Sequence, residues 1–401
     1  MKSESQLRFS SLAHSFPSAL NSLYQERERL LKSGETIVDL ISGNVNAQGI
    51  FFPENILREA LGSALSKTRI YQPDSFGQAE AREAVSSYYA RQGWSIQPSQ
   101  IMLTPGSSLS YFYCFQTLAD PGDEILCPSP SYPLFETIAR LARVELTFYR
   151  LLETRQWEID LDYLESQITT RTRAIVLISP HNPTGAVTSP SQCAELAAIA
   201  NRHGLPIISD EVFSEFLYGP ATLPRPAASD APLVLTLNGI SKMYALPGMK
   251  QGWIAVSGEE FLVKKSLRAF EMIADTFLPV NEAVQFALPE VMRQGADFLQ
   301  SYQAWTRNCQ EIAVQSLARC RLIEFAVPQG GFYVTIRLLG EQIDEERFAI
   351  ALLQQCKTLV HPGYFYDISP SHLVMTFVQE RSLLEKSLNG MTDFINRNVV
   401  S

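Results

Sequence analysis

Three short apolar runs in the middle of the chain constrain the fold more than any other feature of the sequence. Residues 173–178 (RAIVLI), 205–209 (LPIIS) and 233–237 (LVLTL) are almost continuously hydrophobic. Strands of this kind are buried on both faces, as in parallel sheets that helices cover on both sides. A helical pattern over residues 190–202, closed by Gly204, connects the first two runs as a βαβ unit requires. The sequence therefore predicts an α/β fold with a large, doubly wound and mostly parallel sheet.

The same alternation of strand and helix continues on both sides of these runs. Residues 101–104 and 124–127 have the apolar character of strands, and residues 107–118 between them have a helical pattern. Residues 252–256 (GWIAV) add a further strand. Because one alternation covers all of these segments, we expect residues 50–285 to form one large domain.

The pattern changes after residue 285. A long helical region is followed by separated strands at residues 332–336 and 373–377, with helices between and after them. Such a pattern is typical of α+β domains, so we expect a smaller domain over residues 286–401. We expect residues 1–49 to form an N-terminal arm and part of this smaller domain.

The arm is expected to contain an amphipathic helix. Phe16, Leu20 and Leu23 precede the charged stretch ERERLLKSG, whose last residue, Gly34, is typical of the end of a helix. We therefore predict an ordered helical arm rather than a loose tail.

Composition argues against several classes of function. The 401 residues carry a formal net charge of −9 and no extended run of Lys or Arg, so a nucleic-acid partner is not expected. No apolar stretch has the length of a signal-peptide core or a membrane span, so we expect a cytoplasmic protein without a membrane partner. The six cysteines and five histidines lack the spacing of metal ligands. The partner that this composition favours is a small molecule.

Polar residues follow four of the expected strands. In open α/β sheets, ligands bind beyond the carboxyl ends of the strands. Asn182, Asp210 and Lys242 come shortly after the three central runs, and residues 106–108 (Gly-Ser-Ser) follow an earlier strand and open a helix. These residues are therefore the candidates for a ligand site.

Taken singly, each of these residues has an ordinary explanation. Asn182 suits a turn, Asp210 can cap an element, and a loop lysine such as Lys242 is usually solvated. Together they offer an amine, a carboxylate and an amide beside a helix start that can hold a phosphate. Pyridoxal 5′-phosphate (PLP) needs an amine to form a Schiff base, a carboxylate opposite its pyridine nitrogen, and donors for its phosphate. We therefore predict PLP as the cofactor.

Seven short motifs make the chain resemble the class I and II aminotransferases, which are PLP-dependent enzymes of fold type I. The motifs are spread along nearly the whole chain, and their joint occurrence is specific. The pattern is close to that of the alanine and aspartate aminotransferase group. The motifs are Tyr71 with Gly77, Gly106-Ser107-Ser108, Tyr132-Pro133, Asn182-Pro-Thr-Gly185, Asp210-Glu211, Ser241-Lys242 and Gly330-Gly-Phe-Tyr333.

The resemblance implies a role for each matched residue. Lys242 would carry the cofactor as a Schiff base and later move a proton. Asp210 would pair with the pyridine nitrogen, Asn182 would donate to the phenolic oxygen, and Tyr132 would stack on the ring. The implied reaction is a ping-pong exchange of an amino group between an amine or amino acid and a keto acid.

The resemblance also implies which residues lie at the phosphate end and at the substrate end of the site. Tyr71 would reach the phosphate from a second subunit, which implies a homodimer with shared active sites. Gly43 would lie where the N-terminal segment closes over the substrate. The residues expected to hold the phosphate are Gly106, Ser107, Ser108, Ser241 and Lys250.

Two departures from the family pattern concern the cofactor. The family has a tyrosine three residues after the aspartate, and this chain has Phe213, so one donor to the phenolic oxygen is missing. We expect this loss to raise the pKa of the Schiff base. Without the tyrosine donor, the negative phenolic oxygen depends more on the positive charge of the protonated Schiff base, which favours the protonated form. Lys250 replaces the family's phosphate-binding arginine, which keeps the charge but loses the bidentate geometry.

The third departure concerns the substrate. The family arginine that binds the substrate α-carboxylate lies in a pattern H-x-R-x-x-F, and this chain has Val374 at that position in HLVMTF. No arginine occurs within residues 348–380. Three arginines elsewhere could replace it, and the sequence selects none of them: Arg27, Arg29 and Arg337.

Two other functions stay open at the level of the sequence. An enzyme of the same fold could catalyse elimination, decarboxylation or cyclisation on an unusual substrate, because the reaction depends on which substrate bond lies perpendicular to the ring. A regulatory protein that retains PLP without turnover would need a DNA-binding partner domain, which the net charge of −9 disfavours. We therefore favour an aminotransferase.

Overall fold

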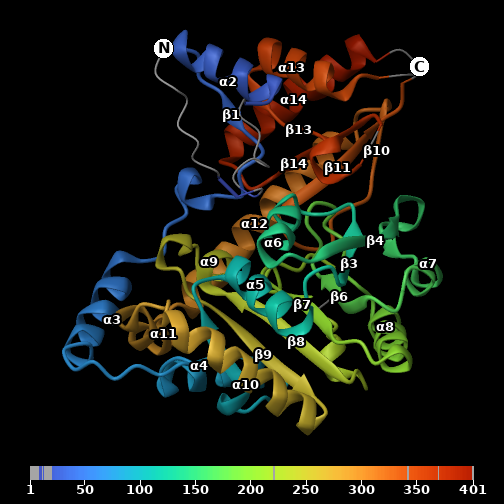
Figure 1. Ribbon diagram of the computed structural model, residues 1–401. Coiled ribbons are helices and arrows are strands. Elements are labelled where there is room, and N and C mark those ends of the chain that lie inside the picture. Colours follow the sequence, from blue (N-terminus) through green and yellow to red (C-terminus); the bar gives the residue numbers. More distant parts are fainter. Residues whose placement is uncertain are drawn as a thin grey trace, which may run out of the picture.

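The computed structural model describes residues 9–10, 12, 20–219, 222–340, 343–368 and 370–399. These residues form a larger and a smaller main sheet, which lie in different parts of the molecule and have their own helices (Figure 1). Phe16, which the sequence places in the N-terminal helix, lies outside the described residues.

The larger sheet has eight strands in the order β2-β9-β8-β7-β6-β3-β4-β5. The central strands from β8 to β4 pair in parallel, whereas β2 and β9 at one edge and β5 at the other pair antiparallel. The expected doubly wound and mostly parallel α/β fold is confirmed. The strands are β2 (Ile101–Thr104), β3 (Glu124–Ser129), β4 (Glu145–Leu152), β5 (Glu158–Ile159), β6 (Thr172–Ile178), β7 (Ile207–Asp210), β8 (Leu233–Gly239) and β9 (Gly252–Gly258).

Strand β6 shows why the central runs are apolar throughout. Ala174, Val176 and Ile178 face one side of the sheet, where α5, α6 and α10 complete the core. Ile175 and Leu177 face the other side, which α7 and α8 cover. Because both faces are covered, side chains that alternate between them are all apolar. The helices are α5 (Ser107–Leu118), α6 (Leu134–Ala142), α7 (Leu161–Ser166), α8 (Pro190–His203) and α10 (Glu260–Phe277).

Three further helices pack at the β2 edge of the sheet. They are α3 (Glu54–Lys67), α4 (Ala79–Arg91) and α11 (Glu282–Gln294), and they share a core with β2 and β9. Trp253 of β9 is fully buried in this core, and its indole N–H donates to Tyr89 Oη at 2.9 Å. In the parts of the chain that the structure describes, no helix combines the length and the apolar character needed to cross a membrane.

The smaller sheet is antiparallel and has the order β10-β11-β14-β13. The strands expected near residues 332–336 and 373–377 are its neighbours β11 and β14. A separate parallel pair, β1 with β12, joins residues 38–39 of the N-terminal segment to this region. The remaining elements are α2 (Ser22–Lys32), β1 (Val38–Asp39), β10 (Ile323–Phe325), β11 (Tyr333–Leu338), α12 (Ala296–Leu317), α13 (Glu345–Cys356), β12 (Thr358–Leu359), β13 (His361–Pro362), β14 (His372–Thr376) and α14 (Arg381–Asn398).

A buried ion pair fixes the turn that follows β7. Arg225 Nε lies 2.8 Å from Glu211 Oε2, and both side chains are almost fully buried. A second guanidinium nitrogen of Arg225 donates to Gln92 Oε1 at 2.6 Å. Burial raises the pKa of Glu211, and the charge of Arg225 opposes this shift. The charge of Arg225 therefore favours the ionised form of a buried carboxylate next to Asp210, against the effect of burial.

Replacement of Arg225 by Met should destabilise the protein strongly. The substitution leaves Glu211 buried without its partner, and breaking a buried pair in this way costs about 3–5 kcal/mol. The urea midpoint of unfolding, followed by circular dichroism, measures the effect. The control is Arg58→Ala, which removes an exposed ion pair with Glu54 and should leave the midpoint almost unchanged. Equal midpoints for the two variants would contradict the role of the buried pair.

Candidate active site

One cavity of about 840 Å³ lies at the carboxyl ends of β6, β7 and β8. Asn182 follows β6, Asp210 ends β7, and Lys242 lies in the short helix α9 (Ile240–Met243) directly after β8. Because the three strands are neighbours in the sheet, their terminal residues meet at one place. The predicted site residues that line this cavity are Gly106, Ser107, Ser108, Tyr132, Asn182, Asp210, Ser241, Lys242 and Lys250.

Lys242 is partly buried, and it lines this cavity and a second one that adjoins it. Its Nζ donates to the backbone oxygen of Gly43 at 3.4 Å and lies 5.8 Å from the centroid of the Phe213 ring. Burial lowers the pKa of Lys242 to about 8. About one tenth of this lysine is therefore a neutral, nucleophilic amine at pH 7, far more than at the usual lysine pKa of about 10.4.

The carboxylate of Asp210 is held by two donors. The backbone N–H of Val212 donates to Oδ1 at 3.0 Å, and the phenol of Tyr111 donates to Oδ2 at 2.8 Å. Burial raises the pKa of Asp210 to about 6, and the two hydrogen bonds oppose this shift. The sequence reasoning missed Tyr111. The available signal was its helical spacing from Ser107 and Ser108, which places all three on one face of α5.

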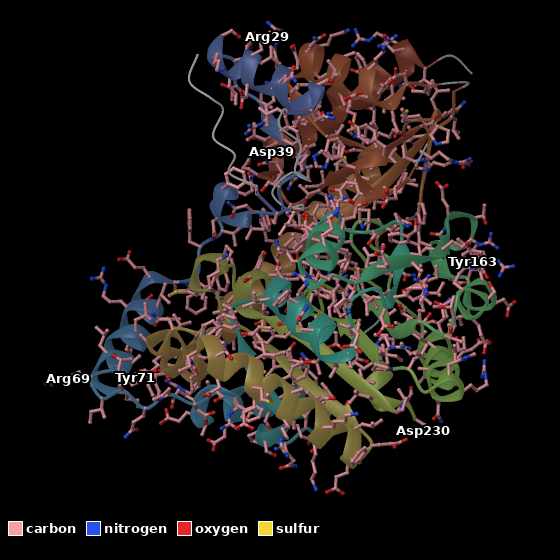
Figure 2. All side chains as sticks on the ribbon, in the orientation of Figure 1. Arg29, Asp39, Arg69, Tyr71, Tyr163 and Asp230 are labelled. Carbon is pink, nitrogen blue, oxygen red and sulfur yellow. The ribbon has the colours of Figure 1, made fainter. Side chains whose placement is uncertain are left out.

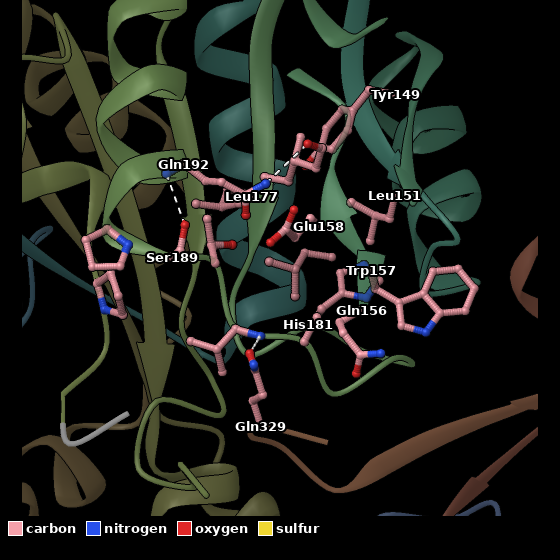
Figure 3. A pocket seen from close by; sticks show the side chains of 17 residues that line it. Tyr149, Leu151, Gln156, Trp157, Glu158, Leu177, His181, Ser189, Gln192 and Gln329 are labelled. Atoms are coloured by element: carbon pink, nitrogen blue, oxygen red, sulfur yellow. Dashed lines mark hydrogen bonds between the residues drawn. The ribbon is translucent and has the colours of Figure 1, made fainter. Parts of the chain in front are cut away.

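Hydrogen bonds hold the loop that carries Asn182 on the side away from the site cavity. His181 Nδ1 lies 2.9 Å from Thr184 Oγ1, and the backbone N–H of Val187 donates to Gln329 Oε1 at 3.2 Å. His181 and Gln329 line a separate cavity of about 310 Å³ (Figure 3). The Asn182 Oδ1 atom is buried without a hydrogen-bond partner, so this amide keeps bonding capacity for a ligand.

The opposite end of the cavity suits an anion. Gly106 precedes α5 with a φ of 119°, a conformation that other residues rarely adopt. The first residues of the helix, Ser107 and Ser108, line the cavity with Ser241 and Lys250. A helix N-terminus with two hydroxyls and an ammonium group is a suitable receptor for a phosphate.

A second cavity of about 460 Å³ adjoins the first at Lys242 and extends toward the smaller sheet. A Cβ atom at Gly43 would lie 2.8 Å from Tyr333 Oη and 3.6 Å from Lys242 Nζ, so a side chain there would fill the space above the amine. Tyr333, which belongs to one of the family motifs, also lines this cavity with His361 and Tyr366. The second cavity is therefore the candidate place for the substrate.

Two predicted site residues do not line either cavity. Tyr71 is 72% exposed and lies beyond α3 at the edge of the molecule (Figure 2). Val374 is 1% exposed and lies in the apolar core on β14. The first position is accessible to another subunit, whereas the second is closed to any ligand.

None of the three candidate arginines lines either described cavity. Arg29 is exposed and pairs with Glu26, and Arg337 pairs with Glu324 and Glu153. Arg27 acts on the phenol of Tyr24 through its charge but does not reach the cavity lining. The missing α-carboxylate arginine is therefore not replaced by any of them within the described cavities.

The donor set fits PLP. The cavity brings together an amine, a buried carboxylate, the side-chain amide of Asn182, whose NH2 group can donate to an oxygen, and a helix start beside an ammonium group. These are the groups that the cofactor's aldehyde, pyridine nitrogen, phenolic oxygen and phosphate require. Across the described residues, no group of three or more His, Cys, Asp or Glu side chains is placed to hold a metal ion.

Comparison with known proteins agrees with this geometry. Residues 35–386 match the model of the family "Aminotransferase class I and II". The alanine aminotransferase of Mycobacterium bovis is 33% identical, with 93% of this chain and 89% of that protein covered. The glutamate-pyruvate aminotransferase AlaA of Escherichia coli is 29% identical, with 93% of both chains covered.

Solved structures give the same result. The alanine aminotransferase of Pyrococcus furiosus superposes with a TM-score of 0.91 at 27% identity, over 98% of this chain and all of that chain. The aspartate aminotransferase of Thermus thermophilus superposes with a TM-score of 0.86 at 26% identity, over 97% of this chain. The chain belongs to the class I and II aminotransferases, and it is a PLP-dependent enzyme of fold type I.

Proposed function

We propose that Lys242, Asp210 and Asn182 carry the aminotransferase reaction of this enzyme. The observation that supports this most is their convergence on one cavity from three neighbouring parallel strands. The family and the named relatives favour transfer of an amino group over elimination, decarboxylation or cyclisation. We propose a ping-pong exchange between an amine or amino-acid donor and a carbonyl acceptor such as a keto acid.

Lys242 would hold the cofactor and move a proton at the substrate carbon. When bound, the cofactor withdraws electrons from that carbon and so makes its hydrogen acidic. The lowered pKa of Lys242, about 8, suits a group that must both take up and release a proton near neutral pH. Its position between Gly43 and Phe213 keeps the amine inside the cavity.

Asp210 and Asn182 would fix the electronic state of the ring. Asp210 remains an acceptor because Val212 and Tyr111 oppose the effect of burial on its pKa. A carboxylate opposite the pyridine nitrogen favours its protonated, electron-withdrawing form. Tyr132, which lines both cavities, would cover the ring and exclude water from its face.

The phosphate would lie at the start of α5, and the active site would be shared between two subunits. We infer a homodimer because Tyr71, at 72% exposure, is open to solvent in its own subunit and lines neither of the two cavities at Lys242. Exposed apolar neighbours support a contact surface here, namely Leu65 at 60% and Ile70 at 68% exposure. The domain boundaries near residues 50 and 285 and the cytoplasmic location stay predictions.

Replacement of Lys242 by Ala should remove covalent attachment of the cofactor and lower aminotransfer by at least about 10²- to 10⁴-fold, because the amine is also the proton carrier. The absorbance spectrum of the purified protein and a coupled transaminase assay measure the two effects. Lys264→Ala, at an exposed lysine of α10, is the matched control and should change neither. A Lys242→Ala protein that keeps the absorbance of the attached cofactor would refute the assignment.

Replacement of Tyr111 by Phe should make the stability of the cofactor-free protein fall more steeply with pH. The folded-state pKa of Asp210, about 6, lies above the usual value of about 3.9, so protonation of Asp210 stabilises the folded state. This stabilisation is fully present below about pH 4. That contribution is lost as the pH rises through about 6, and loss of the phenol donor raises the folded-state pKa further.

The melting temperature of this variant at pH 5 and pH 8 measures the effect. The wild type and Tyr113→Phe are the references, because Tyr113 lies on the same helix and its buried hydroxyl has no hydrogen-bond partner. We expect Tyr111→Phe alone to lose additional stability at pH 8, on the order of 1–2 kcal/mol. The same pH dependence in all three proteins would show that Tyr111 does not act on Asp210.

A further inference from the structure

The wall of the substrate cavity opposite Lys242 carries no cation. The cavity of about 460 Å³ runs from Lys242 to His361 and Tyr366, and no other Lys or Arg occurs among its described lining residues. Burial lowers the pKa of His361 to about 4, so its imidazole is neutral near pH 7. The charged group that acts on His361 is the carboxylate of Asp39, which opposes the shift. A negatively charged substrate group would meet no positive partner at this wall.

Val374 lies behind the uncharged wall that His361 and Tyr366 form. On β14, Leu373 and Met375 face the core of the smaller sheet, whereas Val374 belongs to the apolar cluster that includes Tyr366. In the sheet, Val374 also lies opposite His361 of β13. A longer side chain at position 374 would therefore extend toward the two residues that close the cavity. Valine places only methyl groups behind them.

A chain of hydrogen bonds takes the place of the cation. His361 Nε2 lies 2.8 Å from Tyr24 Oη, and His361 Nδ1 lies 3.1 Å from Tyr366 Oη. A neutral imidazole has one N–H and one acceptor nitrogen, so one phenol donates to the ring and the other accepts from it. If the Tyr366 phenol donates to His361, its oxygen can still accept a hydrogen bond from a ligand. If it accepts from His361, its O–H can still donate to a ligand.

This chemistry selects a hydroxyl group over a carboxylate. A hydroxyl both donates and accepts, so it can complete the bonding of Tyr366 in either arrangement, whereas a carboxylate only accepts. Burial raises the pKa of Tyr366 and of Tyr333, so both phenols stay uncharged. A substrate carboxylate at this wall would lose its hydration and would meet only neutral groups and the negative charge of Asp39. No favourable ion pair would then offset the cost of removing it from water.

We propose that the amino donor carries an uncharged hydroxyl group where an α-amino acid carries its carboxylate, so that the donor is an amino alcohol bound at Tyr366. This inference rests on the proposed aminotransferase function and specifies its substrate class. The donor carbon loses a proton to Lys242 and exchanges its C–N bond for a C=O bond, with oxygen from water. PLP, which Lys242, Asp210 and Asn182 would hold, would take up the amino group and two electrons, and a carbonyl acceptor would then receive both and release its oxygen as water.

A matched pair of amines that cannot undergo transamination by loss of an α-hydrogen tests recognition separately from aminotransfer. 2-Methylalanine and 2-amino-2-methylpropan-1-ol share one skeleton and lack a hydrogen on the amine-bearing carbon, and they differ in carboxylate against hydroxymethyl. Their dissociation constants are measured by titration of the holoenzyme absorbance. We expect the alcohol to bind at least about tenfold more tightly, which corresponds to about 1.4 kcal/mol. Equal or tighter binding of the acid would overturn the proposal.

A second measurement tests the contact with Tyr366. Tyr366→Phe should weaken binding of the alcohol by about three- to tenfold and leave tert-butylamine, which lacks the hydroxyl, unaffected. Tyr364→Phe removes an exposed phenol that bonds Asn21 and lines neither cavity, and it should affect neither ligand. If Tyr366→Phe weakened both ligands equally, Tyr366 would support the fold without binding the hydroxyl, and the assignment would be wrong.

Reactive compounds distinguish failure of this inference from failure of the proposed function. Alaninol and alanine are added to the holoenzyme, and conversion of its absorbance is followed. If the unreactive alcohol binds as expected but neither reactive compound converts the absorbance, aminotransfer fails and the recognition stands. If alanine converts the absorbance and the unreactive acid binds better than the alcohol, aminotransfer stands and the substrate class is overturned.

Discussion

The parallel pairing of β6, β7 and β8 determines where the three main candidate active-site residues, Asn182, Asp210 and Lys242, lie. Parallel strands bring their carboxyl ends to one edge, and each of these strands is immediately followed by a different functional group. The pairing itself depends on the apolar cover of both faces by helices. The amine, carboxylate and amide therefore meet without any of them being adjacent in sequence.

Burial shifts the pKa values of the two central ionisable groups, Lys242 and Asp210. It lowers the pKa of Lys242 to about 8 and raises that of Asp210 to about 6, so both shifts favour the neutral forms. Tyr111 and Val212 limit the shift of Asp210, while the Lys242 amine has a weak contact with a backbone carbonyl. A bound pyridine nitrogen would supply the positive partner that Asp210 lacks. Toward the substrate the same low-polarity environment continues, because Tyr366 lines the wall, Val374 packs in the apolar cluster behind it, and Lys242 is the one Lys or Arg among the described lining residues.

The sequence predicted the central sheet and most of the residues that line the candidate cofactor cavity, because apolar runs and the residues after them are local signals. The antiparallel course of β9 was not predictable from alternation alone, because the segment between β8 and β9, which contains the short helix α9, is compatible with either direction of β9. Tyr111 was missed because its contact with Asp210 depends on how α5 lies over the sheet. The hydrogen-bonded chain from Tyr24 through His361 to Tyr366 joins residues more than 300 positions apart, and no sequence pattern indicates such a contact.

The most direct test of the central claim is to locate the lysine that carries the cofactor. The holoenzyme is reduced with borohydride, which fixes the cofactor to its lysine, and the labelled peptide is identified by mass spectrometry after proteolysis. The label should be found on Lys242, the amine beside Gly43 and Phe213. A label on Lys250 or on any other lysine, or no labelled peptide from protein shown to contain the cofactor, would contradict the assignment.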